Sequence, residues 1–118
     1  MRIYIAHSTD IDYENEIYQP LRNDEDLKRH ELILPHEKSK DINNTREDYK
    51  TYDIIIAECS KPSTGVGIEL GWCYDDGKPI YGFYKIGTKP SDAVKNIVKD
   101  MIEYKDSQDL VDKIKNLI

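Results

Sequence analysis

The residue with the clearest chemical potential is a glutamate that stands among glycines and apolar residues. Positions 62–72 read Pro-Ser-Thr-Gly-Val-Gly-Ile-Glu-Leu-Gly-Trp, which places Glu69 near the start of a largely apolar helix. Such a carboxylate is either stabilised by the helix N-terminus alone or retained for function. Gly65 and Gly67 let a ligand approach the backbone and expose its N–H groups. Followed by a helix, they indicate a site for one phosphate group.

The motif spacing and the net charge of the chain limit which phosphate-containing molecule this site can bind. No Gly-Lys-Ser/Thr follows the glycines, so this is not a Walker loop, and the spacing is not a clean dinucleotide fingerprint. The net charge of −6 over 118 residues argues against a nucleic acid polymer, which needs a basic face. A single small nucleotide, held by backbone N–H groups, is compatible with that charge.

The elements that must position this segment alternate along the chain. Apolar runs typical of buried parallel strands lie at Arg2–Ala6, Glu31–Leu34, Asp53–Glu58, Pro79–Tyr84 and Met101–Tyr104. Helical patterns lie at Tyr13–Lys28, Thr45–Tyr52, Gly67–Asp76, Ser91–Lys99 and Ser107–Leu117. The alternation predicts a single α/β domain over residues 1–118. We expect three layers around a doubly wound, five-stranded parallel sheet, flavodoxin-like, with strand order 2-1-3-4-5.

Several local details are predicted within these elements. Pro20 should bend the first helix or start a new piece. Ser91 and Ser107 are expected N-caps, and Thr45 with Asp48 resembles a capping box. Asp53 and Glu58 are expected to be structural, with Glu58 accepting backbone N–H bonds in the turn that follows it.

The two cysteines and the apolar runs bear on cellular context. Cys59 and Cys73 match no zinc pattern and are expected to be reduced core residues of a cytoplasmic protein. No apolar stretch is long enough for a membrane span. The opening strand is too short for a signal peptide, so we expect no membrane association.

A longer motif connects the glycine-rich segment to the strand before it. Asp53-Ile-Ile-Ile-Ala-Glu58, then Pro62-Ser63-x-Gly65-x-Gly67-x-Glu69-Leu70-Gly71, resembles the signature of the nucleoside 2-deoxyribosyltransferase superfamily. The match is closest to its 2′-deoxynucleoside 5′-phosphate N-hydrolase branch. Weaker similarity covers the first strand with Ser8, the segment Leu34-Pro35-His36, and the end of the chain.

The resemblance implies an activity. Glu69 would attack C1′ of a 2′-deoxynucleoside 5′-monophosphate or deoxynucleoside and displace the base, forming a covalent deoxyribosyl-enzyme intermediate. Water then gives hydrolysis, and a second base gives transfer. No metal and no organic cofactor is needed. The family further implies a homodimer whose sites share residues.

Substrate contacts are implied by the same resemblance. Ser63, with the backbone at Gly65 and Gly67, would bind the 5′-phosphate, since the nucleoside-using transferases usually carry an acidic residue there. Ser8 matches a second phosphate-binding serine, although the arginine that usually follows is absent and Asp10 occupies that neighbourhood. A turn serine is the structural alternative for Ser63.

Two further residues complete the expected substrate site. Ser91 matches a serine that a neighbouring subunit contributes in the family, although a plain N-cap is an equal interpretation. Tyr4, on the first strand, is expected to contact the ligand.

The proton donor to the leaving base is the open point. The family uses an aspartate on the helix before the third strand, and an ungapped alignment puts Thr45 there. Asp48 lies about one helical turn later and is the candidate general acid; otherwise it is the capping partner of Thr45. Glu47 and His36 are alternatives, and His36 could instead stack on a base or be a plain loop residue.

Two competing functions remain. The first is a non-catalytic nucleotide-binding or regulatory module that has lost the general acid. The second is a flavodoxin-like redox or signalling domain. The loop after the first strand argues against a flavin site, because it lacks the run of Ser/Thr and Gly residues that binds the flavin phosphate. The same loop argues against a signalling receiver domain, because the expected paired acids are absent.

Overall fold

The computed structural model describes residues 1–37 and 45–118, and within these residues five strands form one parallel sheet. The strands are β1 (Arg2–His7), β2 (Glu31–Ile33), β3 (Ile54–Glu58), β4 (Ile80–Lys85) and β5 (Asp100–Tyr104). Their order is β2-β1-β3-β4-β5, and every neighbouring pair is parallel. The predicted flavodoxin-like class and strand order are confirmed.

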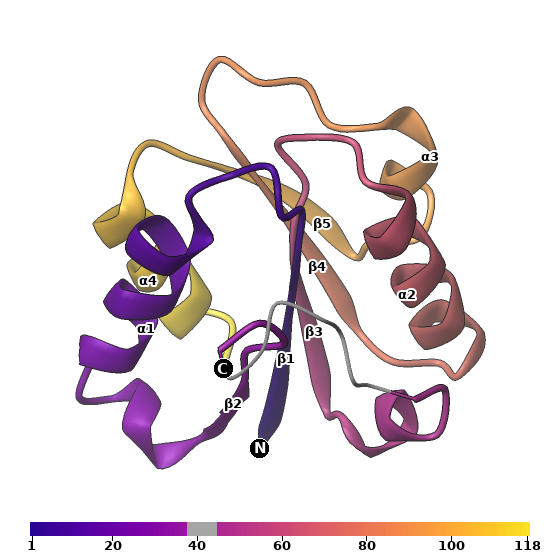
Figure 1. The fold of residues 1–118 in the computed structure, drawn as a ribbon, viewed down its shortest axis with the longest axis horizontal. Coiled ribbons are helices and arrows are strands. Elements are labelled where there is room, and N and C mark those ends of the chain that lie inside the picture. The colour runs from indigo at the N-terminus through magenta and orange to yellow at the C-terminus, as the bar shows by residue number, and fades with distance from the viewer. Residues whose placement is uncertain (38–44) are drawn as a thin grey trace.

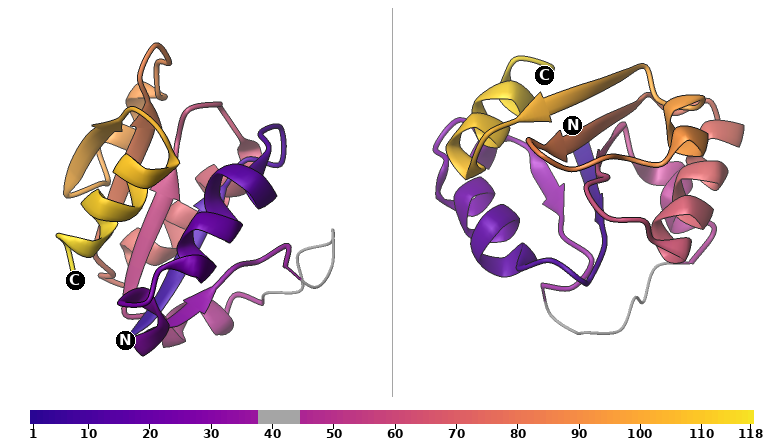
Figure 2. Two further views of the ribbon diagram at one scale, coloured as in Figure 1. Left: turned by 90° about the vertical axis from the view of Figure 1, so that its left-hand side faces the viewer. Right: turned by 90° about the horizontal axis from the view of Figure 1, so that it is seen from above.

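Helices cover both faces of the sheet (Figures 1 and 2). On one face lie α1 (Gln19–Asn23) and α4 (Ser107–Lys115), which contact each other. On the other lie α2 (Thr64–Asp75) and α3 (Asp92–Lys95). In the described part of the chain, no helix is long and apolar enough to cross a bilayer.

The buried strands divide their side chains between the two helical layers. Ile3 and Ile5 of β1 belong to the core beneath α1 and α4, whereas Tyr4 and Ala6 belong to the core beneath α2. This alternation is the ordinary consequence of strand geometry. Tyr4 therefore shares a side of the sheet with the helix that carries Glu69.

The first predicted helix is broken into three pieces. A π-helical turn at Glu14–Tyr18 leads into α1, with Pro20 at its start, and a 3-10 turn follows at Leu27–Arg29. Proline lacks an N–H and crowds the preceding turn, so the expectation that Pro20 starts a new piece is confirmed.

Two other helices are shorter than the patterns predicted. Thr45–Tyr52 contains only a 3-10 turn at Asp48–Thr51, because the backbone is already extended at the next residue, where the chain enters β3. The predicted helix Ser91–Lys99 is limited to α3, because the N–H of Lys99 pairs with the carbonyl of Ile80 as the chain turns into β5.

Two helix starts also differ from the expectation. Helix α2 begins at Thr64, three residues before the predicted start at Gly67. The N-cap of α4 is Asp106, whose carboxylate accepts the N–H of Asp109 at 2.9 Å. Ser107, the predicted cap, instead donates its hydroxyl to the carbonyl of Glu16 at 2.8 Å.

Candidate active site

Glu69 lies on the inward side of α2 and is nearly buried, with 6% of its surface exposed. Its neighbours on that stripe are Val66, Leu70 and Cys73, all buried. Burial raises the pKa of Glu69, and hydrogen bonding from the hydroxyls of Tyr49 and then Tyr4 opposes that rise. No ion pair to Glu69 is present among the described residues, so tyrosine hydroxyls are its polar surroundings.

Three tyrosines pack together beside this carboxylate. Tyr4, Tyr49 and Tyr52 are each at most 2% exposed. The rings of Tyr4 and Tyr52 stack with centroids 4.8 Å apart, and the ring of Tyr49 meets Tyr4 edge-on at 5.2 Å. The hydroxyls of Tyr4 and Tyr49 are 3.4 Å apart. The sequence analysis named Tyr4 but missed Tyr49, whose signal was its place one residue after Asp48 on the turn facing α2.

An arginine fixes the 3-10 turn against the far end of α2. The guanidinium of Arg46 forms two hydrogen bonds to Asp76, at 2.7 and 2.9 Å, and lies over the ring of Trp72 at 5.7 Å. Trp72 in turn meets the ring of Tyr49 edge-on at 5.6 Å. The bidentate hydrogen bonds and the ring contacts together hold Tyr49 beside α2, level with Glu69 along the helix.

The candidate acids on the 3-10 turn point elsewhere. Asp48 is exposed, and its carboxylate accepts the N–H of Thr45 at 2.8 Å, while the Thr45 hydroxyl accepts the N–H of Asp48 at 3.3 Å. This is the reciprocal capping pair that the sequence left open. Glu47 is exposed too, and it forms an ion pair with Lys50 at 3.3 Å. The turn thus directs Tyr49, and neither carboxylate, into the core beneath α2.

The N-terminus of α2 is capped but keeps free donors. The Ser63 hydroxyl accepts the N–H of Val66 at 3.3 Å, and the Ser63 carbonyl accepts the N–H of Gly67 at 3.0 Å. Among described residues, the N–H groups of Thr64 and Gly65 have no acceptor. No acidic residue stands in the first turn. Two free donors and the positive end of a 12-residue helix together favour an anion.

The fold does not require glycine in this first turn. A Cβ built on Gly65 would meet only the Ser63 hydroxyl oxygen, 4.0 Å away, and one built on Gly67 would meet nothing within 4 Å. Glycine in a helix costs stability relative to alanine. The space left beside the backbone is therefore available to a molecule outside the chain.

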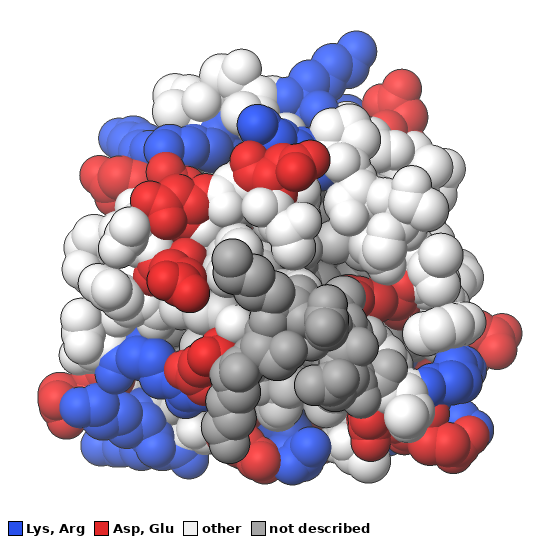
Figure 3. Space-filling view, in the orientation of Figure 1, with Lys and Arg blue, Asp and Glu red and all other residues white. Residues whose placement is uncertain are grey.

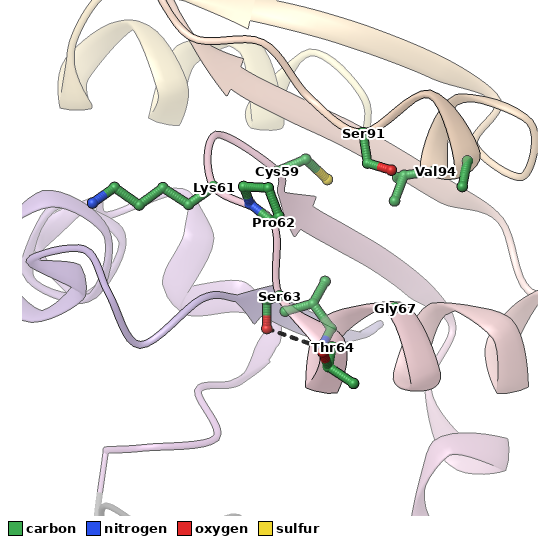
Figure 4. Close-up of a pocket in the computed structure, with 10 residues that line it drawn as sticks. Cys59, Lys61, Pro62, Ser63, Thr64, Gly67, Ser91 and Val94 are labelled. Carbon is green, nitrogen blue, oxygen red and sulfur yellow. Dashed lines mark hydrogen bonds between the residues drawn. The ribbon is translucent and has the colours of Figure 1, made fainter.

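A cavity of about 360 Å³ opens beside the start of α2 and the loop before α3 (Figure 4). It brings together Ser63, Gly67 and Ser91, three of the residues predicted to bind substrate. Ser91 occupies the N-cap position of α3, as predicted, but its side chain makes no capping hydrogen bond there. Among the described residues that line the cavity, Lys61 is the only charged one.

Glu69 does not line this cavity but lies on the other flank of the same helix. Residues two apart on an α-helix point about 200° away from each other, so Glu69 and Gly67 diverge. Gly65, four residues before Glu69, shares its flank. The predicted site therefore wraps around the N-terminus of α2, with Ser63 and Ser91 on one side and Glu69 with Tyr4 on the other.

Ser8 is buried directly after the carboxyl end of β1. Its side-chain oxygen accepts the N–H of Asp10 at 3.0 Å, which shapes the turn after the strand. The hydroxyl hydrogen stays available for a further acceptor.

His36 lies on the opposite side of the sheet, in an aromatic cluster that the sequence did not reveal. Its backbone N–H donates to the hydroxyl of Tyr18 at 2.9 Å, and its ring lies 5.5 Å from that of His7. His7 Nδ1 is 2.9 Å from the carbonyl of Ser8, and Nε2 is 2.7 Å from the Tyr18 hydroxyl. Since a carbonyl only accepts, Nδ1 carries the hydrogen and Tyr18 donates to Nε2.

His7 is held in the neutral form by its surroundings. Burial, opposed by the bond to Ser8 and assisted by the nearby His36, lowers the pKa of His7 to about 4. His36 thus stands next to a neutral imidazole on the α1 face, separated by the sheet from Glu69. The structure does not bring the two predicted site residues His36 and Glu69 together.

Glu58 closes the carboxyl end of β3 and is structural, as predicted. Its buried carboxylate accepts the Ser60 N–H and the Ser60 hydroxyl, each at 2.7 Å, and the hydroxyl of Tyr104. The Ser60 oxygen also accepts the N–H of Lys85 at 2.8 Å. Asp53 lies at the other end of β3, accepting the Arg2 N–H at 2.6 Å. Both acids are satisfied within the fold.

The two cysteines do not supply a nucleophile. Both are free and buried, as the sequence predicted. Burial raises the pKa of the Cys59 and Cys73 thiols to about 12, so neither is a thiolate at neutral pH.

Comparison with solved structures identifies the fold. The Clostridium botulinum CMP N-glycosidase BcmB matches with a TM-score of 0.66 and 20% identity, over 98% of this chain and 99% of that one. A 2-deoxyribosyltransferase from Bacillus psychrosaccharolyticus matches with a TM-score of 0.64 and 23% identity, over 94% and 90%. The chain has the fold of these enzymes. The resemblance inferred from the motif is thereby confirmed at the level of the fold.

Other comparisons are less specific. A flavodoxin-like domain from Synechococcus matches with a TM-score of 0.51 and 18% identity, over 97% of this chain and 99% of that one. No family model and no curated protein sequence matches the chain.

Proposed function

We propose that this protein cleaves the N-glycosidic bond of a nucleoside 5′-monophosphate, with Glu69 as the nucleophile at C1′. The observation that carries the proposal is the pairing of two features on one helix. A nearly buried carboxylate without an ion-pair partner among the described residues lies about one turn from two unoccupied N–H donors. A nucleotide presents a phosphate and an electrophilic sugar carbon at a comparably short separation.

The proposed reaction has two steps. The C1′–N bond breaks, its electron pair leaves with the base, and a Glu69 oxygen bonds to C1′ as positive charge develops there. Water then attacks C1′ and restores the carboxylate, and the proton that this water loses balances the one that the departed base gains; alternatively, a second base takes the sugar. The raised pKa of Glu69 reflects weak solvation, which makes its ionised form a stronger nucleophile. The hydroxyls of Tyr49 and Tyr4 keep it oriented.

The phosphate would bind at the start of α2. Ser63 accepts the N–H of Val66, which leaves its own O–H free to donate to a phosphate oxygen. The free N–H groups of Thr64 and Gly65 add two more donors. Ser8 and Ser91 are proposed to supply further hydroxyls from neighbouring loops.

The relatives support this choice of chemistry. A CMP N-glycosidase and a 2-deoxyribosyltransferase share the fold over nearly the full chain. The name of the first gives a ribonucleotide, CMP, as its substrate, and the name of the second refers to deoxyribose. Both ribose and deoxyribose substrates should therefore be tested.

The decisive experiment measures release of free base from matched nucleosides and 5′-monophosphates, in ribose and deoxyribose forms. Wild-type protein should release base from at least one 5′-monophosphate, and Glu69→Gln should lower kcat by at least about 1,000-fold. Glu103→Gln, at an exposed position on β5, is the matched control. Normal turnover by Glu69→Gln would refute the proposed nucleophile.

The second candidate function is a nucleotide-binding module without turnover. It is favoured by one observation, namely that Asp48 is exposed and occupied by its capping pair with Thr45. Calorimetric binding of a 5′-monophosphate by both wild type and Glu69→Gln, with base release by neither, would establish this function instead.

We also propose that two chains form a homodimer. Helix α2 leaves Ile68 and Trp72, which are four residues apart on one face, exposed at 51% and 37%, next to Gly67 and Gly71. Such an apolar helix face suits a second copy of the chain. Light scattering coupled to size-exclusion chromatography tests it, and a monomer at micromolar concentration would contradict it.

A further inference from the structure

Lys61 is one of the described lysines whose ammonium group has no carboxylate within 4.0 Å, together with Lys78, Lys89, Lys99 and Lys105. Six described lysines lie within 4.0 Å of a carboxylate, namely Lys28, Lys50, Lys85, Lys95, Lys113 and Lys115. No described carboxylate lies that close to Lys61. Its side chain is exposed, and its ammonium group donates to one backbone carbonyl, that of Asp10, at 3.3 Å. A long hydrogen bond to a neutral group at the surface holds an ammonium weakly.

The place of that ammonium group links two loops of the candidate site. Lys61 is two residues before Ser63 in the loop after β3, and it reaches Asp10, two residues after Ser8 in the loop after β1. In Figure 4 its side chain extends away from Ser63 and Ser91 toward the loop that follows β1. Two of the three serines proposed to bind phosphate, Ser8 and Ser63, thus stand on the two loops that Lys61 spans.

The surroundings make this one cation significant. Lys61 is the only charged residue among those described as lining the cavity beside α2. In Figure 3 the surface over α2 and α3 is mostly free of charged side chains, whereas both signs crowd the surface over α1 and α4. The whole chain carries a net charge of −6, which repels an anion. Within the described lining of this cavity, a phosphate dianion therefore finds one positive charge, that of Lys61.

We propose that Lys61 selects phosphorylated substrates, by exchanging the carbonyl of Asp10 for the phosphate of a nucleoside 5′-monophosphate. This inference rests on the proposed function. The four-carbon stem of lysine allows the ammonium group to turn between two acceptors without backbone movement. The charge-assisted bond to phosphate replaces a weak bond to a carbonyl, so the exchange is favourable only when the phosphate is present. Lys61 therefore acts on specificity and leaves the chemistry at C1′ to Glu69.

The test compares kcat/KM for a 5′-monophosphate with kcat/KM for the matching nucleoside. Lys61→Gln keeps most of the stem and removes the charge. It should lower the value for the monophosphate by about tenfold or more and change the nucleoside value less than about twofold. Lys61→Arg should retain most of the preference. Lys99→Gln, exposed before β5 at the opposite edge of the sheet, is the matched control and should change neither value.

Salt gives a second readout. Raising ionic strength should weaken monophosphate use by wild type more than by Lys61→Gln, because screening acts on the charge that the variant lacks. An equal loss on both substrates, or no loss on the monophosphate, would overturn the inference.

The inference can be separated from the proposed function. If no variant releases base, calorimetry with the 5′-monophosphate still decides, since Lys61→Gln should bind it about tenfold more weakly than wild type while Lys99→Gln does not. Absence of base release then refutes the enzyme, and equal binding by the two variants refutes the role of Lys61.

Discussion

The hydroxyls of Tyr4 and Tyr49 lie 3.4 Å apart, and both act on the carboxylate of Glu69. One tyrosine comes from the first strand and the other from the 3-10 turn before β3. Between them they oppose the effect of burial, which alone would keep Glu69 protonated over a wider pH range. The ionised form of the proposed nucleophile therefore depends on two neutral donors.

Replacing Tyr49 by Phe should shift the acidic limb of the kcat–pH profile to higher pH. Burial already raises the pKa of Glu69, and the variant removes the larger of the two hydrogen-bond effects that lower it. A larger fraction of Glu69 is then protonated at a given pH, so activity is lost at a higher pH on acidification. Tyr52→Phe is the control, because the Tyr52 hydroxyl donates to no carboxylate in the described structure. An unmoved limb in Tyr49→Phe would contradict the assignment.

Replacing Ser63 by Asp should exchange the substrate preference and preserve the helix. Aspartate caps a helix as well as serine does, so the unfolding free energy should change by less than about 0.5 kcal/mol. The added carboxylate repels a phosphate, and kcat/KM for the monophosphate should fall about tenfold or more while the nucleoside value is kept. Ser63→Thr, which retains both cap and hydroxyl, should behave as wild type. Equal losses on the two substrates would show that Ser63 is only a cap.

Gly65→Ala should make the protein more stable and less active. The new methyl group meets no close neighbour within the chain, and alanine is the better helix former, so the gain is up to about 1 kcal/mol in urea unfolding. The same methyl group occupies space beside the free N–H groups, and kcat/KM should fall about tenfold. Gly71→Ala, equally open and further along α2, should gain stability without that loss. Full activity in Gly65→Ala would show that the first turn of α2 is not part of the substrate site.

His7 should make folding stability depend on pH in a defined window. Its folded pKa of about 4 lies below the ordinary 6.5, so the unfolded chain binds the proton first on acidification. The stabilisation is complete above pH 6.5 and is lost as the pH falls toward 4, by about 3 kcal/mol in total. His7→Gln should flatten the unfolding free energy across that window, relative to wild type. An unchanged slope in His7→Gln would contradict this role of His7.

The central strands β1 and β3 could be predicted from the sequence because their residues are buried on both sides of the sheet. Runs such as Ile54–Glu58 leave no polar face, and the helical patterns between them require right-handed crossovers in one sheet. The structural role of Glu58 could be predicted as well, because a carboxylate at the end of a strand can accept hydrogen bonds from the N–H groups of the following turn.

Helix boundaries were harder to predict, because single contacts decide them. The glycines at 65 and 67 suggested a late start for α2, yet the Ser63 cap and the burial of Val66 extend the helix backward. The predicted helix before β3 is reduced to one 3-10 turn, because the backbone is already extended at Tyr52, where the chain enters the strand. Its short 3-10 form turns Tyr49 inward and Asp48 outward.

Two residues of the site region, His7 and Tyr49, were missed, and only His7 had a signal in the strand alternation. His7 follows Ile3 and Ile5 on the same face of β1, which places its ring beneath the α1 layer. Tyr49 belongs to none of the motifs of the sequence, and the fold alone brings its hydroxyl to Glu69.

The bonds of Glu58 join the ends of three strands, since Ser60 reaches Lys85 on β4 and Tyr104 belongs to β5. The loop after β3 is thus anchored at Ser60 on one side and at the Ser63 cap on the other. Only Lys61 and Pro62 lie between these two anchors. Mutational drift or laboratory evolution can therefore retune ligand choice at this two-residue bridge while the surrounding scaffold keeps its shape.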